Sequence, residues 1–110
     1  MKPEDKIRIQ HMIDASVEAL SFVKEIKKRK FKKNRMLILS VIKEIEIIGE
    51  AAAKISKETY SQNPDVPWKD ITGMRNRLIH GYFEVDVNRV WDTIQYNLPS
   101  LIKSLEKIIK

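Results

Sequence analysis

Apolar residues recur at three- and four-residue spacing in four stretches of the chain, and this pattern predicts four helices. The first stretch covers 3–29, the second 34–59 and the shorter third 67–81. The last begins at Asp86 and continues to the C-terminus. Asn34 and Asp86 are of the types that cap helix N-termini. Three long helices and one short helix predict an all-α fold, an antiparallel bundle of four main helices.

The second predicted helix has an unusually broad apolar surface. One stripe of it is formed by Ile38, Val41, Ile42, Ile45, Ile48, Ala52 and Ile55. The neighbouring Met36, Leu37, Leu39 and Ile47 extend the apolar surface beyond this stripe. Such a helix is expected at the centre of a bundle or beneath a second chain. Near the other end of the sequence, Pro99 removes one backbone donor and is expected to bend the last helix.

Composition narrows the possible classes of protein. The chain has 110 residues, so we expect a single domain over 1–110. It has no cysteine, which excludes disulfides, thiolate nucleophiles and cysteine zinc sites. No apolar run approaches the ~20 residues that span a bilayer, and the N-terminus lacks an apolar signal core. We therefore expect a cytoplasmic protein without a membrane partner.

The formal net charge of +6 favours polyanionic partners where the charges cluster. The run from Lys27 to Arg35 carries seven basic residues in nine positions. It can guide RNA phosphates or dock an acidic partner, and it can equally be a solvated loop that Phe31 anchors. His11 has no clear metal-ligand partners in sequence, so we expect a structural role and neither a metal nor a cofactor.

Three glutamates, Glu44, Glu46 and Glu50, lie along the second helix. A carboxylate cluster with a catalytic or metal-binding role is conceivable. The simpler interpretation is a solvated helix face on which Glu50 pairs with Lys54 one turn away.

The stretch "MRNRLIHGYF", from Met74 to Phe83, concentrates side chains suited to chemistry. On an ideal helix Asn76 and His80 lie opposite the core face and four residues apart, close enough to touch. Arg75 lies about 140° away from His80 on the same helix. If both act on one substrate, either the helix distorts at Gly81 or two copies share the site.

A glycine on the expected exposed face favours the second option. Gly73 would let another backbone approach closely. We therefore expect a two-fold homodimer in which both copies of this helix line one cleft.

These side chains suit RNA cleavage without a metal. Arginine holds phosphate oxygens, histidine transfers protons near neutral pH, and asparagine orients the imidazole or donates to an oxyanion. The spacing of these residues alone is also compatible with a simpler interpretation, in which they have no catalytic role. Arg75 can be an ordinary surface ion pair, and His80 is favoured near a helix C-terminus by the helix dipole.

The segment from Arg75 to Tyr82 resembles the R-x4-H-x-Y motif of the HepT toxins in the HEPN superfamily. The similarity extends through "PWKDITGMRNRLIHGYFEVDVNRVWDTIQYNLPSL" and upstream to "IEIIGEAAAKIS". This resemblance implies an all-α bundle that dimerises with the motif at the dimer cleft. It also implies a metal-independent endoribonuclease, with Arg75 on phosphate, His80 on protons and Asn76 orienting or stabilising.

The resemblance further implies a toxin–antitoxin pair. The antitoxin would be MntA, a minimal nucleotidyltransferase that adds AMP to the motif tyrosine, here Tyr82. Two other functions remain open at this point. One is a non-catalytic helical dimer that binds a nucleotidyltransferase or a nucleotide, and the other is a general RNA-binding bundle.

Overall fold

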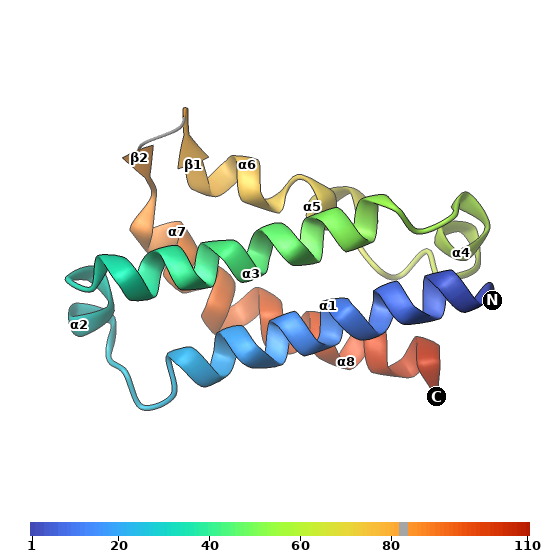
Figure 1. Cartoon of the computed structure of the whole chain (residues 1–110), viewed down its shortest axis with the longest axis horizontal. Helices are drawn as coiled ribbons and strands as arrows, with labels where there is room; N and C mark the ends of the chain where they lie inside the picture. Colours follow the sequence, from blue (N-terminus) through green and yellow to red (C-terminus); the bar gives the residue numbers. More distant parts are fainter. Residues whose placement is uncertain (82–83) are drawn as a thin grey trace.

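Two long antiparallel helices form the front of the molecule in the computed structural model, which describes residues 1–81 and 84–110 (Figure 1). They are α1 (Pro3–Phe22) and α3 (Arg35–Ala53), and they pack against each other along their length. The C-terminal helix α8 (Leu98–Ile109) packs on α1 from behind. The chain thereby buries one continuous apolar core between its first, middle and last helices.

Shorter elements connect and flank these helices. In chain order they are α2 (Lys28–Lys32), α4 (Lys57–Gln62), α5 (Trp68–Thr72), α6 (Met74–Leu78), β1 (Ile79–His80), β2 (Glu84–Val85), α7 (Val87–Asp92) and the π-helical η1 (Thr93–Asn97). The pair α5–α6 contacts α3, and α7, η1 and α8 follow one another directly. The predicted all-α fold class and antiparallel bundle are confirmed.

The predicted apolar stripe of the second helix faces the core. Every member of the stripe is 5% exposed or less. Complete burial of an aliphatic side chain of this size contributes on the order of 1.5–3 kcal/mol, so α3 supplies much of the stabilisation of the bundle. No helix in the described part of the chain is long and apolar enough to cross a membrane.

The first two helices end earlier than predicted. The first ends at Phe22 rather than 29, and Glu25 follows it with a φ of 63°, a left-handed conformation that a helix cannot contain. The second ends at Ala53 rather than 59, because Ser56 adopts an extended conformation and caps α4. A serine hydroxyl that bonds the next helical turn competes with helix continuation in this way.

A buried carboxylate stabilises the break between α3 and α4. Asp5, 1% exposed, accepts hydrogen bonds from the backbone N and the hydroxyl of Ser56 and from the hydroxyl of Thr59. Burial would raise the pKa of the Asp5 carboxyl, but these bonds and the charge of Lys2 lower it overall. The start of α1 is thus joined to α4 at one end of the bundle.

The C-terminal helical segment starts where predicted. The Oδ1 of Asp86 accepts from the backbone N of Arg89, as an N-cap does. The irregularity expected from Pro99 takes the form of η1, which ends just before α8 begins. Pro99 has no N–H to donate one turn back, so the regular hydrogen-bond ladder is interrupted in this region.

Candidate functional site

The candidate motif lies across a helix end and a short hairpin, and the predicted continuous helix over 67–81 is wrong. Gly73 separates α5 from α6, and α6 ends at Leu78. The next residues form β1, which pairs antiparallel with β2 and sets His80 opposite Glu84. Gly81 has a φ of 71°, the left-handed conformation predicted for it, although it follows a strand instead of a helix.

Packing explains the hairpin. Ile79 and Val85 are register partners, are half-buried and pack against the core. The backbone N of Asp86 donates to the carbonyl of Leu78 at 2.8 Å, which secures the end of α6. Two β-branched side chains on one face of a strand pair gain from packing that a further helical turn would not provide.

The hairpin separates the motif histidine from the helix. Arg75 and Asn76 belong to α6, and exposed His80 belongs to β1. The four-residue helical spacing predicted for Asn76 and His80 therefore does not apply, and no hydrogen bond joins them in the described residues. Tyr82, the expected modification site, lies outside the described residues.

Arg75 is held loosely. Its Nε lies 3.5 Å from Oε1 of Glu46 on α3, and its Nη1 lies 3.5 Å from Oδ1 of Asn76. Both distances are at the long limit for hydrogen bonds. The side chain of Arg75 is 42% exposed and that of Glu46 30%, so the ion pair contributes at most about 1 kcal/mol. The guanidinium can exchange this weak partner for a phosphate oxygen.

An open groove of about 370 Å³ surrounds this arginine. Its walls come from α3 and from the α5–α6 segment, with the lining residues Glu46, Gly49, Glu50, Ala53, Thr72, Arg75 and Asn76. Because Gly49 and Ala53 have small side chains, the wall of the groove formed by α3 is shallow. Glu46 was expected on a solvated face, and its place beside Arg75 is a contact that the sequence analysis missed. The spacing of Glu46, Gly49 and Ala53 on one helical stripe is the signal that marks this wall.

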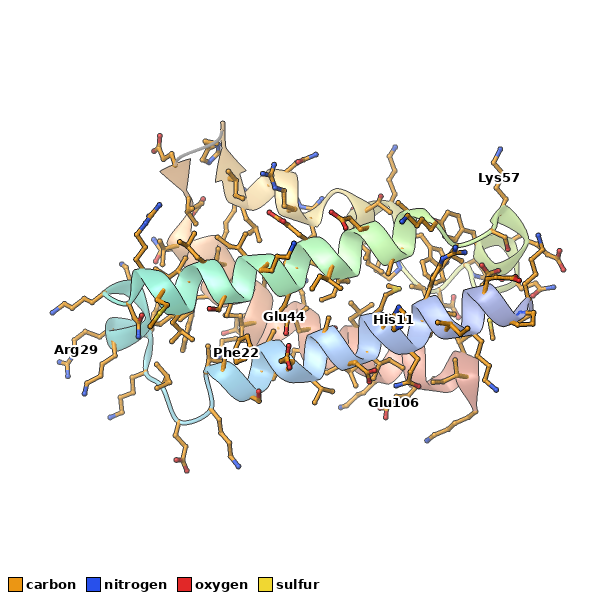
Figure 2. The ribbon with its side chains drawn as sticks, in the orientation of Figure 1. His11, Phe22, Arg29, Glu44, Lys57 and Glu106 are labelled. Carbon is orange, nitrogen blue, oxygen red and sulfur yellow. The ribbon has the colours of Figure 1, made fainter. Side chains whose placement is uncertain are left out.

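Glu44 does not lie on a solvated face, contrary to the prediction. It is 5% exposed in the seam between α1 and α3 (Figure 2), and its Oε2 has no hydrogen-bond partner in the described residues. Burial, together with the neighbouring Glu18, raises the pKa of Glu44 to about 7. Both glutamates line a hollow separate from the Arg75 groove.

The basic run forms α2 and its flanking turns at one end of the molecule. Its lysines and Arg29 are exposed, and Figure 2 shows Arg29 projecting away from the bundle. Phe31 is fully buried with its ring centroid 5.2 Å from that of Trp91, so the prediction that it anchors the loop is confirmed. His11 is exposed on α1, and no cluster of three metal-ligating side chains occurs in the described residues.

Known proteins of similar sequence belong to the family that the motif indicates. The family model "Ribonuclease HepT-like" matches residues 12–108. A Methanocaldococcus jannaschii protein named "Putative RNase MJ0125" is 41% identical over 93 residues, which cover 84% of this chain and 80% of the relative. Another from that organism, "Putative RNase MJ1216", is 36% identical over 99% of this chain and 90% of its own length.

A protein of Thermococcus cleftensis named "Probable ribonuclease HepT" is 34% identical over 110 residues, the full length of both chains. No solved structure matches this chain significantly. The family match covers most of the sequence, including Arg75, Asn76 and His80. The chain belongs to the HepT-like ribonuclease family.

Proposed function

We propose that this protein is a metal-independent endoribonuclease and the toxin subunit of a HepT/MntA-type pair. The observation that carries the proposal is the loosely held, partly exposed Arg75 in an open groove, five residues before an exposed His80, in a chain of the HepT-like ribonuclease family. Both side chains are accessible to a polyanion as large as RNA.

Each motif residue has a role in the proposed reaction. His80 accepts the proton of a ribose 2′-OH, whose oxygen attacks the adjacent phosphorus. Arg75 exchanges Glu46 for phosphate oxygens and stabilises the charge that develops on them. The bond from phosphorus to the 5′-oxygen breaks, that oxygen takes a proton, and a 2′,3′-cyclic phosphate remains. Asn76, next to Arg75 on α6, orients a reacting group or stabilises the developing charge.

The site is proposed to be shared in a homodimer. Gly73 gives this dimer little support, because it is half-buried and a Cβ there would lie 3.4 Å from Nη1 of Arg77 and from the Lys69 carbonyl of the same chain. Support comes instead from α3, where Met36 is 78% and Leu39 45% exposed. Exposed apolar side chains gathered on one face are typical of protein–protein contacts.

Analysis of RNA ends tests the activity. Purified protein is incubated with RNA in the presence of a chelator, beside the variants Arg75→Ala and His80→Ala. We expect new ends with 2′,3′-cyclic phosphate, and a loss of about 100-fold or more in either variant, the scale of general acid–base catalysis. His11→Ala is the matched control, because it removes an exposed histidine on another helix.

Cleavage by His80→Ala at the rate of the unaltered protein would contradict the proposal. Absence of new RNA ends, together with harmless expression, would favour the non-catalytic dimer that binds a nucleotidyltransferase or a nucleotide.

The proposed antitoxin is a minimal nucleotidyltransferase that attaches AMP to Tyr82. A bulky anion on the residue two positions after His80 in the sequence would hinder the approach of RNA and repel its phosphates. Co-expression followed by intact-mass measurement should show added AMP, and Tyr82→Phe should remove it. Added AMP on the Tyr82→Phe variant would exclude this tyrosine as the acceptor.

A further inference from the structure

A second concave site lies between the α5–α6 segment and the α7–η1–α8 segment. It is a groove of about 410 Å³, within the ~300–1,000 Å³ of small-molecule sites. Arg75 and Arg77 are two positions apart on α6, so their side chains leave the helix on nearly opposite sides. Arg77 lines this second groove and Arg75 lines the first, and the two grooves share no lining residue.

One wall presents an aromatic ring and polar groups in a row. Asp92, Tyr96 and Ser100 follow at four-residue spacing along the wall formed by η1 and its neighbours, and all three line the groove. Tyr96 is 73% exposed, whereas Phe31 and Trp68 are buried. A tyrosine ring that is not used in the core offers a face on which a base can stack. π-helical segments such as η1 are frequent at functional sites.

Two guanidinium groups complete the lining. The Nη2 of Arg77 donates to the carbonyl of Asp70 at 2.8 Å, which fixes the side chain while it stays exposed. Arg89, 61% exposed, is paired with Asp86 only at 3.7 Å. Arginines bind phosphate through parallel N–H donors, so both have capacity for an anion. The carboxylate of Asp92 suits ribose hydroxyls, which donate hydrogen bonds.

We propose that this groove binds one ribonucleotide unit, with its base on Tyr96, its phosphate at Arg77 and Arg89, and its ribose beside Asp92. A free nucleotide and a nucleotide within an RNA strand present the same chemistry. Only the second source depends on the proposed ribonuclease function. The groove is then a binding subsite, separate from the side chains assigned to cleavage.

Calorimetric titration with AMP tests the free-nucleotide source. We expect saturable binding that Tyr96→Ala weakens by about tenfold, the scale for loss of one stacked base, and that Tyr96→Phe leaves nearly unchanged. Arg77→Gln should also weaken it by about tenfold. Arg29→Gln is the charge-matched control, because it removes one exposed positive charge from α2. Because Tyr96 is largely exposed, its replacement leaves the core intact.

Titration with a single-stranded oligoribonucleotide tests the other source. It is done in the His80→Ala background, so that binding is measured without cleavage. Weaker RNA binding in Tyr96→Ala and Arg77→Gln, without AMP binding, assigns the groove to an RNA nucleotide. AMP binding that persists in a protein without ribonuclease activity supports the groove while the proposed function fails. If neither probe responds to these substitutions, or if Tyr96→Phe is as damaging as Tyr96→Ala, the proposal is overturned.

Discussion

The buried carboxyl group of Glu44 makes the folded state sensitive to pH between mildly acidic and neutral conditions. Burial and the nearby Glu18 raise its pKa to about 7 from the ordinary value of 4.5. Between these two values the folded chain holds a proton that the unfolded chain has released. The contribution of Glu44 to stability is therefore largest below the lower value and declines as the pH rises toward 7. Above about 7 the folded state carries the full cost of an unpaired buried charge.

The substitution Glu44→Gln should remove this dependence. Near pH 8 the neutral amide avoids the buried charge, and we expect a higher melting temperature, by about 4 °C for each kcal/mol recovered. Near pH 4 the two proteins should differ little. Thermal unfolding followed by circular dichroism over this pH range measures the effect. Glu50→Gln, on the exposed side of the same helix, is the control, and equal shifts in both variants would contradict the assignment.

At the residue scale, Arg75 could be identified from the sequence, but its interaction partner could not. The motif identified the arginine, the asparagine and the histidine by number, because their spacing is local. The partner of Arg75 was not identified, because Glu46 is separated from it by 29 positions. A contact between two helices depends on how the helices pack, and helical periodicity along one segment does not contain that information.

At the scale of the element, the start of α3 depends on one side chain. The Oδ1 of Asn34 accepts from the backbone N of Leu37 at 3.0 Å, as predicted for an N-cap. Asn34→Ala should lower the free energy of unfolding by about 1 kcal/mol, while Asn34→Asp should retain most of the stabilisation that the N-cap provides. Urea denaturation at neutral pH measures both. The control is Asn88→Ala, which removes an exposed asparagine near the start of α7. If Asn34→Ala lowers the free energy of unfolding no more than Asn88→Ala does, the cap contributes nothing.

Element starts were predicted better than element ends. Asn34 and Asp86 cap through bonds to the next turn, which are local and visible in sequence. The break near Ser56 depends on Asp5, 51 positions away, and the hairpin after Leu78 depends on packing of Ile79 and Val85. Strands of two residues are too short to produce a periodic pattern.

At the scale of the whole molecule, an exposed apolar face lies on the bundle. It is formed by Phe22, Met36 and Leu39, which line a common hollow between α1 and α3. On α3, Leu39, Lys43 and Glu46 follow at four- and three-residue spacing, so this face adjoins the Arg75 groove. We propose that a second copy covers this face, next to the Arg75 groove.

Light scattering at micromolar concentration should therefore give the mass of a dimer. Met36→Asp should shift it to a monomer and reduce RNA cleavage, because a desolvated charge opposes association. Helical content should not change, since Met36 is 78% exposed. Val17→Asp makes the same change at a 51% exposed position away from this hollow and should stay dimeric. A monomeric unaltered protein would contradict the shared site.

The all-α class, the core stripe of α3, the helix caps and the family motif can be read from the chain, because each depends on residues within a few positions of one another. Four features follow from the packing of distant segments: Glu46 faces Arg75, Glu44 is buried, His80 leaves the helix and a second groove opens beside α6. These outcomes depend on which helix faces fill the core together. Burial and hydrogen bonding between distant segments are worth more than the local preference of any one turn, so they fix features that local patterns leave open.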